Sequence, residues 1–356
     1  MMEVEDTSLG FTNRLLNVVA PVTIFVTVAV TSPVLLVWRG VKQLANRPLD
    51  MRDKVVVVTG ASSGIGMHIS YQYAGLGSRL ALVARREEKL DAVAEECRRR
   101  GAPDVLTVPA DLGTQDGCRE AVEQAAKHYG RLDCVVLNAG VAHIYKFEEV
   151  QETEGFRSIM DVNFWGYVFC AKYALKHLRQ TGGQLVVNDS IAEFVPEPNL
   201  SIYNASKAAV SQFFETLRLE AGPGIPITIF QPGVVKSEMT DGKVILADGR
   251  WSSAEEGREL RKEPGFGLFP VLPTPALAKA AVAAARRKTM RAVIPSWYKS
   301  MLFLRLFSPE LFMASLSWLF RGDRTPAKAA QDKMGGGFKA PSDADMREGG
   351  YRKSEE

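Results

Sequence analysis

A tyrosine, a lysine and a serine have the types and spacing needed to exchange a proton with a substrate. Tyr203 and Lys207 are four positions apart in the segment Tyr-Asn-Ala-Ser-Lys, and Ser190 precedes Tyr203 by thirteen positions. On a helix, residues four apart share a face, so the ammonium would lie near the phenol. A phenol titrates near pH 10 in water, and a neighbouring cation lowers its pKa. Tyr203 is therefore a candidate general acid or base, and Ser190 a candidate hydrogen-bond partner for a carbonyl or alcohol oxygen.

A glycine-rich turn follows the first β-branched run of the chain. It reads Thr-Gly-Ala-Ser-Ser-Gly-Ile-Gly, and its candidate cofactor contacts are Gly60, Ser62, Ser63, Gly64, Ile65 and Gly66. Glycines let the backbone approach a pyrophosphate, and the N-terminus of the following helix favours phosphate charge. A purely structural turn is the alternative, but the position between a strand and a helix favours a dinucleotide. The turn lacks the Gly-Lys-Ser/Thr ending of a P-loop triphosphatase.

Two arginines follow the second predicted strand. Enzymes specific for NAD place an Asp or Glu here, about twenty residues after the turn, to accept from the ribose 2′-hydroxyl. This chain has Arg85 and Arg86 instead. A guanidinium pairs well with a phosphate, so we expect NADP(H) as cofactor, with NAD(H) as the less favoured alternative. The other interpretation is that one or both arginines are solvated residues at the start of a helix.

Rigid elements must hold these groups, and the chain predicts them from Lys54 onward. Short β-branched runs alternate with amphipathic segments, as is typical of βαβ units and a parallel sheet. The predicted strands are residues 55–60, 80–84, 105–109, 134–138, 184–188, 227–231 and 291–295. Because these runs are continuously apolar, helices should cover both faces of the sheet. The sequence predicts an α/β doubly wound parallel sheet, and the irregular segment 239–267 beyond the sixth strand is a candidate substrate loop.

The composition excludes several classes of protein. With 46% hydrophobic and 24% charged residues among 356, the chain has ample material for a large core. The formal net charge of +3 comes without a basic stripe interleaved with aromatics, so no nucleic-acid partner is expected. The four cysteines are widely spaced and form no Cys-x-x-Cys pair, which favours reduced thiols and no metal site.

An apolar stretch without charge lies near the N-terminus, at residues 15–37. A cleavable signal peptide would have a basic start and a shorter core, whereas here the basic residues follow the stretch. We therefore expect permanent membrane attachment with the downstream domain on the cytosolic side, a core helix being the alternative. The stretch could span a bilayer, but Pro21 and Pro33 could break it, so we favour a hairpin in one leaflet or an oil phase.

These motifs resemble those of the short-chain dehydrogenase/reductase family over residues 54–295. Further matches are Asp111 after the third strand, Asn138-Ala139-Gly140 after the fourth, Asn163 in the next helix and Pro232-Gly233 after the sixth. The resemblance implies a Rossmann-type fold with a single catalytic domain. It also implies an oxidoreductase that acts on a CH–OH group with NAD(P).

The resemblance assigns roles to particular side chains. It implies a catalytic group of Asn163, Ser190, Tyr203 and Lys207, in which Lys207 also holds the nicotinamide ribose and Asn163 a proton-relay water. The further cofactor contacts that it implies are Asp111 at the adenine, Asn138, Ala139, Gly140 and Tyr203, and Pro232 and Val235 near the nicotinamide. One departure is Asn188-Asp189, where relatives commonly have a small residue and a serine ahead of the catalytic serine.

Within the family, the chain is similar to plant steroleosins and 11-beta-hydroxysteroid dehydrogenase-like proteins, which are lipid-droplet dehydrogenases. The likeness lies in an apolar anchor with a proline knot at residues 20–38, in the segment 203–209 and in the segment 294–298. It implies a steroid or sterol substrate and attachment to a lipid monolayer or the endoplasmic reticulum membrane. Homodimers are common among similar enzymes, so a homodimer is one expected state.

Four segments are expected along the chain. They are an apolar anchor with prolines at 1–47, the dehydrogenase domain at 48–296, an aromatic amphipathic segment at 297–320 and a polar, flexible tail at 321–356.

The prediction is thus an NADP-dependent oxidoreductase that interconverts a secondary alcohol and a ketone on an apolar, steroid-like molecule. The alternative from another class is a non-catalytic lipid-droplet structural or sterol-binding protein. The complete set of Ser, Tyr, Lys and Asn argues against it. An enzyme acting on soluble sugars is a second alternative, disfavoured by the aromatic C-terminal segment. The exact substrate, the direction of the reaction and the oligomeric state stay open.

Overall fold

The structure is a computed structural model of the chain. It describes residues 11–45, 47–150, 153–253, 255, 256, 259 and 269–320. The predicted tail at 321–356 and most of the second half of the predicted loop 239–267 lie outside the described residues.

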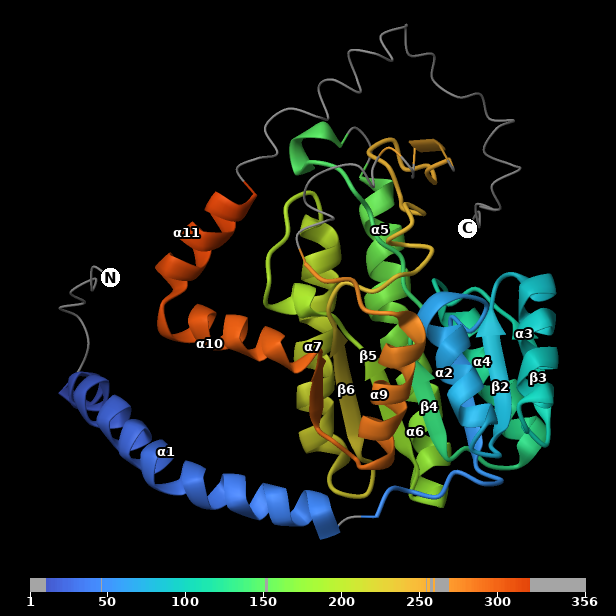
Figure 1. Cartoon of the computed structure of the whole chain (residues 1–356), viewed down its shortest axis with the longest axis horizontal. Helices are drawn as coiled ribbons and strands as arrows, with labels where there is room; N and C mark the ends of the chain where they lie inside the picture. The colour runs from blue at the N-terminus through green and yellow to red at the C-terminus, as the bar shows by residue number, and fades with distance from the viewer. Residues whose placement is uncertain are drawn as a thin grey trace, which may run out of the picture.

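A seven-stranded parallel sheet with the order β3-β2-β1-β4-β5-β6-β7 forms the centre of the molecule (Figure 1). The strands are β1 (Val55–Thr59), β2 (Arg79–Ala84), β3 (Val105–Pro109), β4 (Cys134–Leu137), β5 (Gln184–Asn188), β6 (Ile227–Pro232) and β7 (Arg291–Ile294). All seven predicted strands are confirmed, and their ends differ from the prediction by at most one residue. Because β1 pairs with both β2 and β4, the strand order reverses there, and a crevice opens at the carboxyl ends of the strands.

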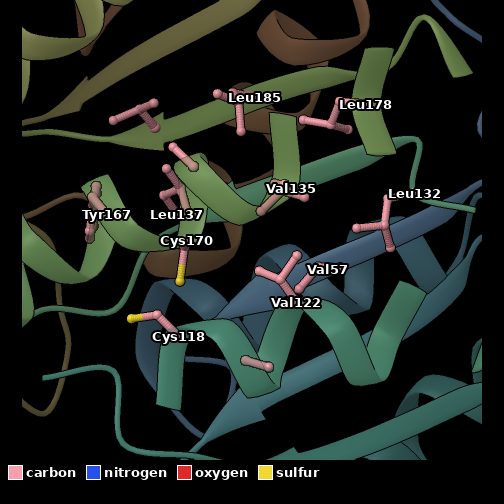
Figure 2. Close-up of a cluster of buried hydrophobic side chains, with 14 of the residues drawn as sticks. Val57, Cys118, Val122, Leu132, Val135, Leu137, Tyr167, Cys170, Leu178 and Leu185 are labelled. Atoms are coloured by element: carbon pink, nitrogen blue, oxygen red, sulfur yellow. The ribbon is translucent and has the colours of Figure 1, made fainter. Parts of the chain in front are cut away.

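Helices cover both faces of the sheet, as the continuous apolar strands predict. One face carries α2 (Gly64–Ala74), α3 (Glu87–Arg99) and α9 (Thr274–Arg286), and the other carries α4 (Gln115–Tyr129), α6 (Gly166–Thr181) and α7 (Ser201–Ala221). Along β1, Val55 and Val57 pack against the second set, and Val56 and Val58 against the first. Figure 2 shows the buried cluster on the second face, where Val57 lies opposite Val122 of α4. The predicted doubly wound fold is confirmed.

The remaining elements of the described residues, apart from the N-terminal helix, are short. They are η1 (Phe147–Glu149), α5 (Glu154–Met160), η2 (Asp161–Trp165), η3 (Ile191–Glu193), η5 (Ser296–Tyr298), α10 (Lys299–Phe307) and α11 (Pro309–Leu319). Tyr298, Phe312 and Leu316 pack this last part of the described chain against Ile191 and Phe194, which lie one and four residues after Ser190. The C-terminal helices are therefore attached to the end of the sheet that carries the predicted catalytic serine.

The N-terminal apolar stretch forms one helix, α1 (Phe11–Ala45), which extends away from the sheet (Figure 1). The structure shows no hairpin over these residues, because one helix runs through both Pro21 and Pro33. A proline removes one backbone hydrogen bond and can kink a helix, but an apolar helix tolerates it when the rest of the ladder persists. Its segment Leu15–Leu35 has 21 residues, a mean hydropathy of 2.1 and no buried part, so it is long and apolar enough to cross a membrane.

Candidate active site

One cavity of about 380 Å³ opens at the carboxyl ends of β1, β4, β5 and β6. Most of the residues predicted to bind cofactor or substrate line it. They are Gly60, Ser62, Ser63, Gly64, Ile65, Arg85, Arg86, Asp111, Asn138, Ala139, Gly140, Ser190, Tyr203, Lys207, Pro232 and Val235. Parallel strands bring these side chains together because their carboxyl ends meet at the same edge of the sheet, although the residues are spread over much of the chain.

Gly66 and Asn163 do not line the cavity, but both lie against residues that do. A Cβ atom at Gly66 would lie 2.3 Å from the Gly60 carbonyl oxygen and 2.5 Å from the Asn138 side-chain nitrogen. Gly60 itself has a φ of +65°, which favours glycine. The turn therefore has a close backbone approach that admits no side chain at Gly66, as a phosphate-binding turn requires.

Tyr203, Ser190 and Lys207 meet at the inner end of the cavity. The Ser190 side chain lies close enough to the Tyr203 phenol to lower its pKa. The Lys207 ammonium lies 5.9 Å from the centre of the Tyr203 ring and donates to the Asn188 carbonyl at 3.0 Å. The helical spacing thus places the lysine and the tyrosine on one side of α7, as predicted.

The predicted direction of the Tyr203 pKa is wrong in this structure. Burial raises the pKa of the phenol, the hydrogen bond with Ser190 lowers it, and the charges of Glu197 and Asp189 raise it further. Lys207 does not reverse this, since its ammonium is itself buried and its own pKa is lowered, mainly by that burial. Loss of hydration therefore outweighs the neighbouring cation, and Tyr203 holds its proton at neutral pH.

Asn188 and Asp189, the departure from the family pattern, form part of a buried polar network. The Asn188 side chain donates to the Asn138 side-chain oxygen at 2.9 Å, and its carbonyl accepts from Lys207. Asp189 accepts from the Gln231 side chain at 2.9 Å. The two residues therefore link β5 to its neighbours β4 and β6, so the geometry around Ser190 is supported by this variant sequence.

Asn163 lies in the single π-helical turn η2 and is completely buried. Its side chain accepts from the Val141 amide at 2.8 Å, donates to the Val141 carbonyl at 2.9 Å and donates to Ser206 on α7 at 3.0 Å. Such π turns are often found at functional sites. Here Asn163 ties the segment after β4 to the helix that carries Tyr203.

At the other end of the cavity, Arg86 lies over the glycine turn. Its guanidinium donates to the hydroxyls of Ser62 at 3.2 Å and Ser63 at 3.0 Å, whereas Arg85 is exposed. Arg86 also pairs with Glu238, whose carboxylate lies 3.1 Å from the guanidinium. Of the two predicted arginines, Arg86 is the one that is hydrogen-bonded to the glycine turn.

Three residues at the site were not predicted. Thr59 accepts from the Asn138 amide at 2.7 Å, and the completely buried His143 accepts from the amides of Ile202 and Tyr203 at 3.1 and 3.2 Å. Glu238 lies opposite Arg86 although 152 positions separate them. The position of Thr59 directly before Gly60 was a signal that its side chain would contact the glycine turn or its neighbours. Nothing in the sequence indicated that His143 would accept hydrogen bonds from amides at the start of α7, or that Glu238 would contact the glycine turn.

The donor set fits a nicotinamide dinucleotide. The Gly60–Gly66 approach supplies a backbone cradle, Arg86 with the serine hydroxyls supplies charge and hydrogen bonds for phosphate, and Tyr203 with Lys207 lies at the far end of the same cavity. Within the described residues, no cluster of His, Cys, Asp and Glu could hold a metal ion, and the four cysteines are free and buried.

Comparisons with known proteins agree with this geometry. Residues 54–244 match the family model described as short chain dehydrogenase. The chain is 41% identical over 312 residues to an 11-beta-hydroxysteroid dehydrogenase from Pinus massoniana, over 87% of this chain and 85% of that protein.

Two solved structures are similar over most of the domain. A short-chain dehydrogenase from Sphingobium yanoikuyae in complex with NADPH is 27% identical with a TM-score of 0.60, over 73% of this chain and 95% of that chain. A short-chain dehydrogenase/reductase from Burkholderia phymatum in complex with NAD is 22% identical with a TM-score of 0.66, over 74% and 96% of the two chains, and shows likeness of fold. The parallel sheet, the family match and the level of identity to the plant relative lead to one conclusion: this chain belongs to the short-chain dehydrogenase family and is an oxidoreductase.

Proposed function

We propose that the protein interconverts a secondary alcohol and a ketone on an apolar, steroid- or sterol-like molecule, with NADP(H) as cofactor, at a lipid droplet or the endoplasmic reticulum membrane. The observation that carries the proposal is the meeting of Tyr203, Ser190 and Lys207 with the Arg86 phosphate turn in one cavity. The plant relative bears the name of a hydroxysteroid dehydrogenase, which supports the substrate class.

The phosphate end of the cavity favours NADP(H). Arg86 sits at the end of β2, where an NAD-specific enzyme would place an acid, and its guanidinium already donates to Ser62 and Ser63. Lys89 and Lys243 add positive charge nearby, since both contact the carboxylate that Arg86 contacts. The solved relative from Sphingobium yanoikuyae holds NADPH, which agrees with this choice.

The substrate end of the cavity is apolar. Ala142, Ile144 and Val244 form a buried cluster against which Leu200, Tyr203, Met239 and Leu246 pack. Most of these side chains line the cavity, together with Trp251. A sugar would leave its hydroxyls unpaired against such a wall, whereas a steroid skeleton would bury apolar surface.

The chain's own residues can carry the proton. When bound, the nicotinamide cofactor supplies the hydride for the carbonyl carbon, or accepts it in the reverse direction. Tyr203 is protonated at neutral pH because burial raises the pKa of its phenol, so it can donate to the substrate oxygen during reduction. Ser190 holds that oxygen in line with the phenol, and Lys207 stabilises the phenolate that the donation leaves behind.

The membrane part of the proposal rests on α1. Its segment Leu15–Leu35 has no buried part, so a lipid environment would remove from water an apolar surface that the domain leaves exposed. The basic residues that follow the apolar stretch favour an orientation in which the domain faces the cytosol. A homodimer stays a prediction, which light scattering of the detergent-solubilised protein tests.

An assay with both cofactors tests the proposal. The detergent-solubilised full chain is mixed with NADPH or NADH and a panel of ketosteroids, with soluble sugars as comparison, and nicotinamide absorbance is followed. We expect steroid-dependent oxidation of NADPH, with NADH less effective. Steroid binding without turnover would support the non-catalytic alternative, and turnover of sugars alone would exclude the apolar substrate.

The double substitution Arg85→Ala/Arg86→Ala tests the phosphate contact. Binding of NADPH should weaken by about tenfold or more, because a hydrogen bond to a charged group contributes about 1.5–3 kcal/mol. NADH binding should change little, since it lacks the 2′-phosphate. Equal losses for both cofactors would mean that the arginines are not phosphate ligands. Arg179→Ala, on the last turn of α6, provides the control because this arginine does not line the cavity.

A further inference from the structure

Glu238 lies in the loop after β6 and reaches across the cavity mouth to the phosphate turn. Its carboxylate contacts Arg86 at 3.1 Å, Lys89 at 3.0 Å and Lys243 at 3.4 Å, and accepts from the Ser63 hydroxyl at 3.3 Å. These partners come from the end of β2, from α3, from the glycine turn and from the loop that carries Glu238 itself. One carboxylate thus connects the loop after β6 with the end of β2, with α3 and with the glycine turn.

The charges around Glu238 do not balance. Three cations surround one carboxylate, and both Glu238 and Arg86 line the cavity and are only partly exposed, with side-chain exposures of 37% and 35%. Although partial burial raises the pKa of Glu238, the hydrogen bonds from Lys89 and Arg86 bring it down to about 2, so the group is charged at neutral pH. The cluster therefore keeps an excess of positive charge that a dianion could satisfy better than a single carboxylate.

The carboxylate uses the same donors that a phosphate would use. Arg86 and the Ser63 hydroxyl both donate to one oxygen of Glu238, and Arg86 at the same time donates to Ser62. A ribose 2′-phosphate bound at this turn would need Arg86 and the serine hydroxyls. Both anions cannot hold Arg86 together without placing like charges next to each other, so one must move when the other binds.

A role for Glu238 as the acceptor of the ribose 2′-hydroxyl of NAD is the competing interpretation. In that role the carboxylate should be open towards the ribose. Here three nitrogen donors and one hydroxyl already occupy it, and the position at the end of β2 carries a cation instead of an acid. The arrangement therefore fits an internal substitute for phosphate better than a ribose ligand.

We propose that Glu238 is a specificity-determining residue that occupies the cofactor's 2′-phosphate site, and that a 2′-phosphate displaces it from Arg86. This inference rests on the proposed use of NADP(H), which brings a phosphate to this turn. The displaced carboxylate keeps Lys243 on its own loop as a partner, so the loop after β6 changes its attachment when the cofactor binds. Glu238 thus lowers the affinity for 2′-phosphorylated ligands and leaves that for unphosphorylated ones nearly unchanged.

Binding measured by calorimetry, without turnover, tests the proposal. The full chain in detergent is titrated with 2′,5′-ADP and with 5′-AMP, which differ in the 2′-phosphate and carry no nicotinamide. Glu238→Gln should bind 2′,5′-ADP about tenfold more tightly than the wild type, equivalent to about 1.4 kcal/mol, and 5′-AMP within about twofold. NADPH and NADH should show the same contrast.

Glu256→Gln is the matched control. Glu256 is also ion-paired, with Arg250 at 2.5 Å, and its pKa is also about 2, but it does not line the cavity. This variant should leave both affinities unchanged. Unchanged or weaker binding of 2′,5′-ADP by Glu238→Gln would overturn the proposal, and weaker binding of 5′-AMP and NADH would establish the ribose role instead.

The two proposals fail in different ways. If the wild type prefers NADH but Glu238→Gln gains affinity for 2′,5′-ADP, the inferred role of Glu238 holds and the proposed cofactor preference fails. If the wild type prefers NADPH and the variant gains nothing, the preference holds and Glu238 is only a structural partner of Arg86. Trypsin cleavage at Lys243 adds an independent readout, since loss of the carboxylate should expose the loop in the ligand-free variant.

Discussion

Burial raises the pKa of the Tyr203 phenol, so the phenol stays protonated at neutral pH. A protonated phenol suits the reduction of a ketone, in which Tyr203 donates a proton to the substrate oxygen. The Ser190 side chain lowers the pKa of the phenol, and His143 accepts hydrogen bonds from the backbone amides of Ile202 and Tyr203 at the start of α7. His143 acts as an acceptor because it is neutral, and burial lowers the pKa of its imidazole to about 4. The backbone of Tyr203 is therefore held by an imidazole that stays neutral at neutral pH.

Tyr203→Phe should abolish turnover while cofactor binding stays within about twofold of the wild type. The substitution removes the transferable proton but not the phosphate turn, and loss of such a donor costs a factor of about 10² or more. Turnover is followed by NADPH absorbance and binding by fluorescence. Tyr173→Phe serves as control, since this hydroxyl pairs with Gln115 outside the cavity. Activity of the Tyr203 variant within about tenfold of the wild type would exclude the phenol as proton donor.

Glu197 gives the site a pH dependence of its own. Burial raises the pKa of this cavity-lining carboxyl to about 7. The folded protein therefore binds the proton more tightly than the unfolded chain. The associated stability is fully present below the unfolded pKa and is lost as the pH rises through the folded value. Glu197 and Asp189 should together lower the unfolding temperature of the wild type between about pH 4.5 and pH 7, whereas the lowered pKa of His143 acts in the opposite direction over part of this range.

Glu197→Gln should flatten that dependence, because the amide stays neutral at every pH. Differential scanning calorimetry of both proteins between pH 5 and pH 8 measures the slope. Part of the slope should persist, since burial also raises the pKa of Asp189. Parallel curves for the two proteins would show that Glu197 is hydrated and ionised in the folded state.

The elements could be predicted more fully than the contacts between them. Runs such as 55–58 and 185–187 are apolar throughout, and only a strand covered on both faces needs that pattern. The spacing of Tyr203 and Lys207 likewise indicated one face of one helix. The direction of the Tyr203 pKa and the position of Glu238 were not predictable, because burial and the pairing of residues 152 positions apart arise only in the tertiary structure.

The turn between β1 and α2 provides a test at the scale of elements. Gly66→Ala would place its methyl group 2.3 Å from the Gly60 carbonyl oxygen, so the turn must open. Overpacking of this kind costs about 1–3 kcal/mol, and we expect a lower Tm together with a loss of affinity for both NADPH and NADH. Gly224→Ala is the control, since a Cβ there meets nothing within 4 Å. Unchanged cofactor affinity in Gly66→Ala would show that the close approach at this turn is not needed for binding.

At the scale of the whole molecule, two exposed apolar surfaces of the described residues lie outside the catalytic cavity. The first is α1, and the second is formed by α10 and α11, where Phe303, Leu306, Phe307, Leu311, Met313 and Trp318 are exposed. Figure 1 shows both extending from the same side of the domain, away from α3 and β3. Either surface could hold the protein on a lipid phase, but α1 alone is long and apolar enough among the described helices to cross a bilayer.

Deletion of residues 1–46 should therefore release a cofactor-binding domain that no longer sediments with membranes or floats with lipid droplets. Flotation of the truncated and full-length proteins from cells measures this, and NADPH binding shows that the domain is folded. If the truncated protein still floats, the surface on α10 and α11 is the main attachment, and Phe303→Ser/Phe307→Ser should then release it. These two side chains are 62% and 77% exposed, so the substitution should leave the fold intact.

A tag at Met1 decides the topology of the full chain. A continuous helix across Leu15–Leu35, at about 1.5 Å per residue, matches a bilayer core of about 30 Å, so the tag should be protected from protease in intact microsomes. Digestion of the tag would mean that the helix lies in one leaflet or bends at Pro21 or Pro33 once lipid surrounds it.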